Sequence, residues 1–98
     1  MERQEGDRVG AIISREGGTV NLLGYGEYKG EEIPSEEAGG MGPIARKLEM
    51  ENPKIELDNG DVVWGCECWW GDESEVQAMV EDADEVNDIS VQEFRQQS

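Results

Sequence analysis

The sequence predicts an α+β domain: an antiparallel sheet of four to five strands built from two hairpins, with one or two short helices on one face. Two alternating apolar segments are each interrupted by a glycine-containing turn, at Gly17-Gly18 and at Asn59-Gly60. After Asp72 the apolar residues follow helical spacing instead. A length of 98 residues suits one folding unit, so we expect residues 1–98 to form a single domain.

The first hairpin is predicted around the paired glycines near the N-terminus. A two-residue turn at Gly17-Gly18 places Ile13 opposite Leu22 and Arg15 opposite Val20. Both faces of this hairpin are partly apolar, which favours a central place in the sheet. The glycines that follow the second strand are expected to extend it or to bend it.

The segments outside the hairpins are less regular. We expect residues 1–7, which are polar, to fray. Residues 31–52 are predicted to be an irregular loop with a short helix near 43–50. Pro43 suits the first helical position, and Pro53 ends this segment.

The second hairpin is the best-specified part of the chain, and residues 53–71 hold all three tryptophans and both cysteines. Asn59-Gly60 predicts a type I′ turn, in which both central residues need a positive φ. The resulting register pairs Leu57 with Val62 and Ile55 with Trp64. One face of the hairpin is then wholly apolar and consists of Leu57, Ile55, Val62, Trp64, Cys66, Cys68 and Trp70.

A helix is predicted after the second hairpin, over residues 73–82, with Asp72 as its N-cap. The acidic residues of its first turn complement the positive end of the helix dipole. Residues 85–91 are predicted to be a last strand followed by a short tail. A terminal helix capped by Ser90 is the alternative.

The net charge is the main functional clue, because 24 acidic and 8 basic residues give −16. From Ile55 to Phe94 the chain has no Lys or Arg. A charge of this sign argues against direct binding to nucleic acid or to anionic membranes. It favours a basic partner, although the same charge could serve only solubility.

Several classes of protein are excluded by what the sequence lacks. The polar N-terminus does not resemble a signal peptide, and no apolar run approaches the ~18 residues that span a bilayer. Without histidine, a catalytic thiol has no obvious base, so we expect no enzyme and no cofactor. Cys66 and Cys68 are expected to be buried, inert and free of metal, although two chains could together supply four thiolates to zinc.

The adjacent tryptophans must point to opposite faces if their strand is continuous. Trp70 is then expected in the core, and Trp69 on an acidic face beside Glu67 and Val63. There Trp69 is either covered by the C-terminal segment or serves as an interface anchor, since tryptophan is enriched at binding hot spots.

Two motifs resemble segments of small, mostly uncharacterised acidic proteins of bacteriophages and prophages. The first is GYGxYxG over residues 24–30 with the following Ile33-Pro34, and the second is NPKIxLDNGxVVWGCECWWG over residues 52–71. The resemblance covers about half of the chain and carries no activity with it. It implies that the protein acts in the cytoplasm of a bacterial host cell, where small phage proteins often block defence systems.

The leading functional hypothesis is therefore a non-enzymatic, phage-type inhibitor of a host defence system, of the anti-CRISPR or anti-restriction type. Its acidic surface would imitate nucleic acid and occupy a basic, nucleic-acid-binding site of a host protein or complex. The residues predicted to bind this partner are Glu67, Asp72, Glu73, Glu75, Glu81, Asp82, Asp84, Glu85 and Asp88.

Two alternatives remain open. The first is a homo-oligomer that sequesters a small nucleotide signal in a site lined by aromatic and basic side chains. The second is a structural or assembly factor of a phage. The residues predicted to line the ligand site are Tyr25, Tyr28, Arg46, Lys47 and Trp69.

Overall fold

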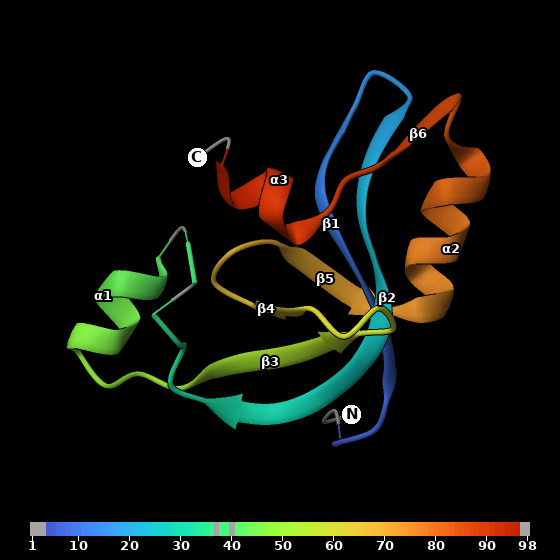
Figure 1. Ribbon diagram of the computed structural model, residues 1–98. Helices are drawn as coiled ribbons and strands as arrows, with labels where there is room; N and C mark the ends of the chain where they lie inside the picture. Colours follow the sequence, from blue (N-terminus) through green and yellow to red (C-terminus); the bar gives the residue numbers. More distant parts are fainter. Residues whose placement is uncertain (1–3, 37, 40, 97–98) are drawn as a thin grey trace.

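A computed structural model describes residues 4–36, 38–39 and 41–96 of the chain. It has six strands and three short helices among these residues (Figure 1). In chain order the elements are β1 (Arg8–Glu16), β2 (Thr19–Glu32), α1 (Gly42–Lys47), β3 (Asn52–Leu57), β4 (Val62–Trp64), β5 (Trp69–Asp72), α2 (Glu73–Asp82), β6 (Glu85–Asp88) and α3 (Val91–Gln96). The expectations for residues 1–3, Glu37 and Gly40 lie outside the described residues.

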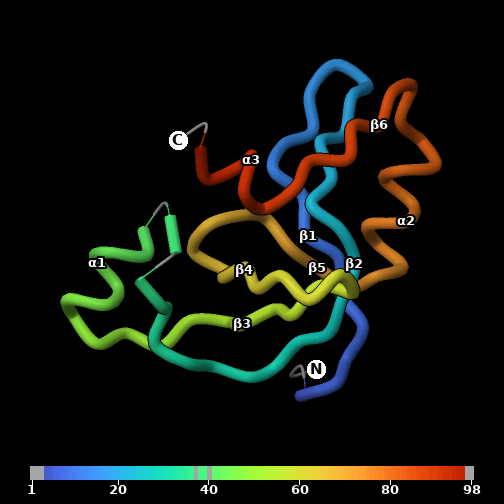
Figure 2. Tube along the Cα trace, viewed as in Figure 1, coloured from blue at the N-terminus to red at the C-terminus, as the bar shows by residue number. Residues whose placement is uncertain are grey.

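The sheet has the strand order β4-β3-β2-β1-β5, with all of these neighbours antiparallel, and β6 adds a parallel pairing with the start of β2. The long strand β2 holds the sheet together, because its other end pairs with β3. Figure 2 shows β6 running beside the first part of β2. The predicted α+β class and antiparallel sheet are confirmed, with the parallel strand β6 as an addition.

The β1–β2 hairpin turns at Gly17 and Gly18, whose φ values of 53° and 84° fit the predicted two-residue turn. Arg15 lies opposite Val20, as expected. The expected pairing of Ile13 with Leu22 is wrong, because Ile13 occupies an irregularity in the register and Ile12 lies opposite Leu22. Ile12 and Ile13 belong to different apolar clusters, because successive side chains of a strand point to opposite faces.

The β3–β4 hairpin differs from the prediction by one residue in register. Ile55 lies opposite Val63 rather than Trp64. Leu57 N–H donates to the Asp61 carbonyl (2.8 Å), and the Leu57 carbonyl accepts a hydrogen bond from Gly60 N–H (2.9 Å). Within residues 57–61, all of which the structure describes, Gly60 alone has a positive φ, of 94°. The connection is therefore a three-residue loop with glycine in the left-handed position, another common hairpin turn.

This register changes which side chains share the core face. Val63 is fully buried beside Ile55, whereas Val62 is half-buried, so the predicted placement of Val62 with Ile55 is wrong. The predicted continuous strand also breaks after Trp64, because Glu67 N–H donates to the Trp64 carbonyl (2.9 Å) and closes a turn. The chain then re-enters the sheet on the far side of β1 as strand β5.

Two apolar clusters lie on opposite faces of the β1–β2 hairpin. The larger cluster is built on strands β1 to β4 and is closed by Val91 and Phe94 of α3. In the smaller cluster, Val76 of α2 packs against Ile12, Val20 and Leu22. The helices thus cover two faces rather than the single face that was predicted.

Helix α2 can approach the sheet closely because Gly10 lies beneath it, and a Cβ atom at Gly10 would come within 2.8 Å of the Val76 Cβ. The predicted helix over residues 73–82 is confirmed at both ends. Asp72 occupies the predicted N-cap position, but within the described residues its side chain makes no capping hydrogen bond.

The C-terminal segment combines the two alternatives that the sequence left open. Residues 85–88 form strand β6, and Ser90 then caps α3 by accepting a hydrogen bond from Glu93 N–H (3.1 Å). The predicted use of Val91 in the last strand is therefore wrong, because Val91 begins the helix and is buried there. The short helix predicted near 43–50 is present as α1 over Gly42–Lys47, with Pro43 in its first turn.

Candidate functional site

The most prominent feature of the surface is a group of exposed acidic side chains on α2, on β6 and on the residues that flank them. Each of these residues is exposed in the structure. We call them the acidic surface, and they are Asp72, Glu75, Glu81, Asp82, Asp84, Glu85 and Asp88.

Backbone contacts hold the acidic surface on the sheet. The carbonyl of Gly18, in the β1–β2 turn, accepts hydrogen bonds from Asp84 N–H (2.7 Å) and Glu85 N–H (3.2 Å). The side-chain amide of Asn87 donates to Asn21 (3.0 Å), which in turn donates to Ser14 (2.8 Å). These hydrogen bonds link β6 to β2 and β1, so the carboxylates on and beside β6 are carried by a strand that is fixed to the sheet rather than by a free loop.

Tyr25 reports the negative potential of this region. It lies on β2, is half-buried and packs against the α2 cluster. Burial raises the pKa of its phenol, and the carboxylates of Glu73, Asp88 and Glu81 raise this pKa further. Acidic groups from both α2 and β6 therefore act on one point of the sheet.

An apolar hollow of about 270 Å³ adjoins the acidic surface and is lined by Ile12, Arg15, Trp69 and Met79. Trp69 is paired with Ile12 across β1 and β5, so both side chains lie on the α2 face of the sheet. The Trp69 side chain is 44% exposed. The expected position of Trp69 beside Glu67 and Val63 is wrong, because the chain turns between β4 and β5.

Acidic side chains border this hollow. A Cβ atom built on Gly71 would lie 2.9 Å from the Trp69 ring and 3.2 Å from a Glu75 carboxylate oxygen, so these two groups are neighbours. On α2, Asp82 follows Met79 by three residues and therefore lies on the same side of the helix. The site thus combines an exposed aromatic ring, an apolar floor, the Arg15 side chain and bordering carboxylates.

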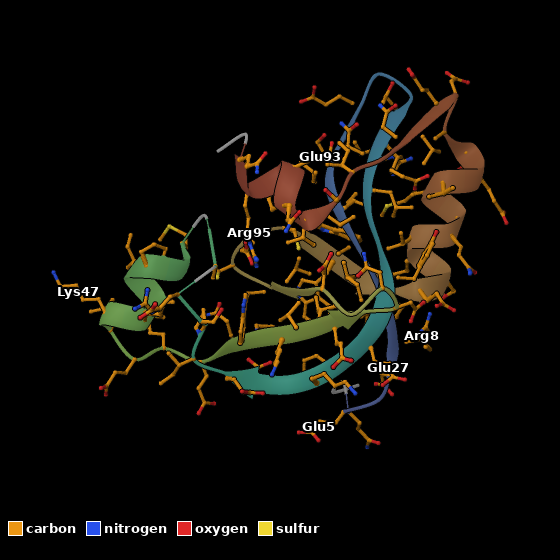
Figure 3. All side chains as sticks on the ribbon, in the orientation of Figure 1. Glu5, Arg8, Glu27, Lys47, Glu93 and Arg95 are labelled. Atoms are coloured by element: carbon orange, nitrogen blue, oxygen red, sulfur yellow. The ribbon has the colours of Figure 1, made fainter. Side chains whose placement is uncertain are left out.

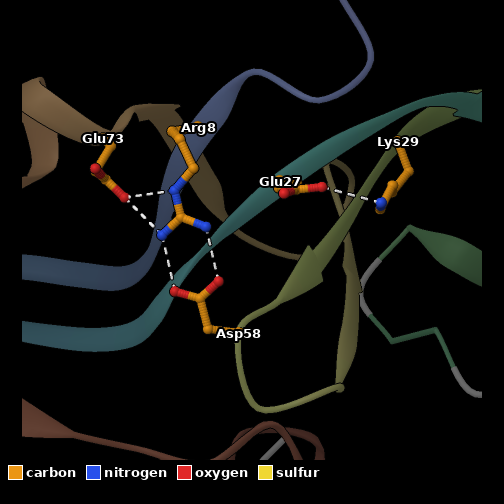
Figure 4. Close-up of polar contacts among 5 residues, drawn as sticks. All are labelled: Arg8, Glu27, Lys29, Asp58 and Glu73. Carbon is orange, nitrogen blue, oxygen red and sulfur yellow. Dashed lines mark hydrogen bonds and ion pairs between the residues drawn. The ribbon is translucent and has the colours of Figure 1, made fainter.

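Glu73, another of the predicted partner-binding residues, takes part in an ion-pair cluster. Figure 4 shows the Arg8 guanidinium between two carboxylates: it donates to both oxygens of Asp58 (2.7 and 2.8 Å) and to Glu73 (2.8 Å). These contacts raise the pKa of Arg8 and lower the pKa of Asp58. The cluster ties the starts of β1 and α2 to the β3–β4 turn, so Glu73 serves the fold.

Glu67 is the predicted partner-binding residue that the structure removes from the surface, because its side chain is 0% exposed. Its carboxylate accepts hydrogen bonds from Arg95 (2.8 and 3.0 Å), from Gly39 N–H (2.9 Å) and from Trp64 N–H (3.3 Å). It therefore joins α3, the loop after β2 and the β4–β5 turn. The sequence does not reveal this role, since the partner Arg95 lies far along the chain.

Another hollow, of about 620 Å³, lies between α3 and the β3–β4 turn. Its charged side chains are Asp61 and Arg95, and Arg95 is bonded to Glu67 and to the carbonyl of Val62 (3.0 Å). None of the predicted site residues lines it. It therefore lacks a convergent set of free polar groups that would recognise a ligand.

The residues predicted to line a nucleotide site do not come together. Tyr28 is 8% exposed and stacks on Trp70 in the larger cluster, with ring centroids 5.6 Å apart. Tyr25 packs against the other cluster, and Trp69 lines the apolar hollow. Arg46 and Lys47 belong to α1, at the opposite end of the molecule from α2 (Figure 1). The expected shared site is therefore wrong.

The two cysteines are free and half-buried, rather than fully buried as expected. Burial raises the pKa of Cys68 to about 12 and also raises the pKa of Cys66, and in both cases the Glu67 carboxylate adds to the shift. Thiols of this kind are poor nucleophiles near neutral pH. Among the described residues, no group of three or more Cys, Asp or Glu side chains is arranged to hold a metal ion.

Comparison of the chain with protein-family models, with curated proteins and with solved structures gave no match. No helix within the described residues is long and apolar enough to cross a bilayer.

Sequence reasoning missed Ile12, Arg15 and Met79 as parts of the site. Met79 follows helical spacing with Val76, which is equally typical of a core position. Only the packing of α2 across β1 and β5 turns its side chain toward Trp69. The exposed tryptophan was the one available signal, because a large aromatic next to acidic residues is typical of interface anchors.

Proposed function

We propose that this protein is a non-enzymatic binding protein whose acidic surface occupies a basic, nucleic-acid-binding site on a host protein. The observation that carries the proposal is the placement of seven exposed acidic residues beside an apolar hollow with a half-exposed tryptophan. The carboxylates would take the place of phosphates, and Trp69 would provide the apolar anchor. Binding sites commonly combine such an anchor with a charged rim.

Electrostatics supports this reading over a purely solubilising charge. The acids from α2 and β6 converge on one region, where they act together on Tyr25. The cations that β1 brings to this side are Arg8, which is bonded to Asp58 and Glu73, and Arg15, which lines the hollow. A predominantly acidic surface attracts a basic partner and speeds its association.

The resemblance of residues 24–30 and 52–71 to phage-encoded proteins supports a host target, namely a defence system that handles nucleic acid. Such systems expose basic grooves for DNA or RNA, and an acidic protein can block the groove without any catalysis. We therefore propose inhibition of a defence complex of the CRISPR or restriction type. The competing idea of a nucleotide-sequestering pocket has no support in the geometry, since its residues lie apart.

The test is a pull-down from bacterial lysate with three immobilised proteins. These are the wild type, a reversal variant and a control of equal net charge. The reversal variant is Glu81→Lys with Asp82→Lys, Asp84→Lys and Glu85→Lys, and the control is Glu49→Lys with Glu51→Lys, Glu56→Lys and Glu93→Lys. All eight positions are exposed.

The proposal predicts that the wild type and the control capture the same basic, nucleic-acid-binding protein and that the reversal variant does not. Added duplex DNA should release the captured protein, and binding should weaken steeply with salt. Several charges must be changed together, because one exposed charge contributes only about 0–1 kcal/mol. Equal capture by both variants, or capture that DNA does not reverse, would refute the proposal.

A further inference from the structure

The turn between β3 and β4 carries a chemically reactive pair of residues, Asn59 and Gly60. A backbone nitrogen can attack the side-chain carbonyl carbon of the asparagine that precedes it. Glycine allows this attack best, because no side chain crowds its nitrogen. Both residues are exposed, so water reaches them. The pair therefore has the chemistry of a site at which a protein is modified without an enzyme.

Hydrogen bonds within the turn hold both reacting groups. Asn59 Oδ1 accepts a hydrogen bond from Asp61 N–H (2.9 Å), so the side chain folds back over the backbone that follows it. The Gly60 N–H, whose nitrogen is the attacking atom, donates to the Leu57 carbonyl (2.9 Å). Attack requires the loss of the proton in this second hydrogen bond. The closed turn therefore brings the two groups together and restrains their reaction.

The other three asparagines of the chain lack this combination. Asn52 precedes Pro53, whose nitrogen carries no hydrogen and cannot attack in this way. Asn21 and Asn87 face each other in the paired strands β2 and β6, and the Asn87 side-chain amide donates to Asn21 Oδ1 (3.0 Å). Asn59 is therefore the asparagine that should react first.

We propose that Asn59 is a deamidation site and that the closed turn slows its reaction. The Gly60 nitrogen bonds to Asn59 Cγ, and the bond from Cγ to the side-chain nitrogen breaks. Ammonia leaves and carries away the proton that the Gly60 nitrogen has lost. Water then opens the five-membered imide at either of its two carbonyls and gives aspartate or isoaspartate.

The two products differ in their effect on the turn. Isoaspartate adds one carbon atom to the main chain between residues 59 and 60, whereas aspartate leaves the main chain unchanged. Two hydrogen bonds span this point, from Leu57 N–H to the Asp61 carbonyl (2.8 Å) and from Gly60 N–H to the Leu57 carbonyl (2.9 Å). Isoaspartate therefore weakens the closure of the turn.

Arg8 links the turn to helix α2 and provides a way to test the effect of closure. It is labelled near the lower end of α2 in Figure 3, and it donates to both oxygens of Asp58 (2.7 and 2.8 Å) and to Glu73 (2.8 Å). Asp58 directly precedes Asn59, so opening the turn disturbs these contacts. Removing the Arg8 side chain loosens the turn without changing any residue in it. This inference does not depend on the proposed function.

The test incubates the purified protein at mildly alkaline pH, both folded and unfolded in guanidinium chloride. Digestion after glutamate releases residues 57–67, in which Asn59 is the one asparagine. Chromatography with mass spectrometry then measures the aspartyl and isoaspartyl forms of this peptide. Arg8→Ala is compared with Arg46→Ala, a matched control that removes an exposed cation from α1, and circular dichroism checks that both fold. Gly60→Ala is measured in the unfolded chain, where its effect on folding has no influence.

Deamidation should begin in residues 57–67, and it should be about tenfold or more slower in the folded wild type, because hydrogen bonds at both reacting groups must break first. Arg8→Ala should speed it about two- to fivefold in the folded protein and leave it unchanged in the unfolded chain, whereas Arg46→Ala should change neither rate. Gly60→Ala should slow the reaction. The isolated isoaspartyl form should unfold at a lower temperature than the Asn59→Asp variant, which keeps the normal main chain.

Equal rates in the folded and unfolded wild type would overturn the proposal, and this comparison needs no variant, so it holds even if Arg8→Ala does not fold. Earlier reaction at another asparagine, or a Gly60→Ala variant that reacts as fast as the wild type, would exclude the assigned site and its mechanism. Equal rates for folded Arg8→Ala and Arg46→Ala would show that closure of the turn does not control the reaction. Equal thermal midpoints of the isoaspartyl form and Asn59→Asp would contradict the effect assigned to the added carbon atom.

Discussion

Replacing Glu67 with alanine should be among the most damaging changes at a charged residue in this protein. The Glu67 side chain is 0% exposed and accepts hydrogen bonds from Arg95, Gly39 N–H and Trp64 N–H. Removing one member of a buried ion pair costs about 3–5 kcal/mol, because the other charge is left without compensation. Arg95 is 22% exposed and can turn partly toward water, so we expect about 3 kcal/mol.

Arg95→Ala should cost less than Glu67→Ala, because the carboxylate keeps its two backbone donors. The double variant should cost clearly less than the sum of the two single changes, with a coupling of about 1–2 kcal/mol. Urea unfolding followed by tryptophan fluorescence measures each value. At a slope of about 1–3 kcal/mol/M, a loss of about 3 kcal/mol lowers the midpoint by about 1–3 M.

The matched control is Glu51→Ala, which removes an exposed carboxylate just before β3. It should change stability by about 0.5 kcal/mol or less, as surface substitutions usually do. A Glu67→Ala variant that unfolds at the same urea concentration as this control would refute the reasoning. Strict additivity of the two single changes would do so too, because it would show that the Glu67–Arg95 contact does not stabilise the fold.

Three further predictions follow from local geometry. Gly10→Ala should destabilise the protein by about 1–3 kcal/mol in the same urea assay, because the new methyl group would come within 2.8 Å of the Val76 Cβ. An unchanged urea midpoint would contradict this packing. Alkylation by iodoacetamide at pH 8, followed by mass spectrometry, should modify Cys68 more slowly than Cys66, because the pKa of Cys68 is raised to about 12; equal rates would contradict this. Asp58→Asn should lower the thermal midpoint at pH 7 and not at about pH 2. Arg8 lowers the pKa of Asp58, so the stabilisation by the Asp58 carboxylate is present above its ordinary pKa and is lost as pH falls through the lowered pKa. An equal effect of the substitution at both pH values would exclude this origin.

Features set by local chemistry could be predicted from the sequence. The turn at Gly17 and Gly18 depends on residues that tolerate positive φ, and few other residues do. Helix α2 begins after Asp72 and ends near Ala83 because its apolar spacing and its acidic first turn are local signals. Exposure of most acidic residues could also be predicted, since unpaired carboxylates are rarely buried.

The register of the β3–β4 hairpin could not be predicted, because Asn59-Gly60 suits two turn types that differ by one residue. The apolar run at Val62, Val63 and Trp64 has no polar residue to mark a solvent-facing side, so it fits either register. The structure chooses the one that buries Val63 beside Ile55.

Features that depend on distant residues also escaped prediction. Strand β5 exists as a separate strand because it pairs with β1, and β6 forms because β2 offers a free edge beside Thr19 to Leu22. Glu67 looked like a surface acid because Arg95, its partner, follows 28 residues later. The hollow at Trp69 appears only when β1, β5 and α2 are assembled.

The central claim is that the acidic surface binds a basic, nucleic-acid-binding protein, and competition by nucleic acid tests it most directly. The first readout is the amount of captured host protein that duplex DNA releases from the immobilised wild type. The second is the amount of the same protein that is captured by the control of equal net charge and by the reversal variant at Glu81, Asp82, Asp84 and Glu85. The account predicts release by DNA, retention by the control and no capture by the reversal variant. Capture that DNA does not reverse, or capture that the charge reversal leaves unchanged, would contradict it.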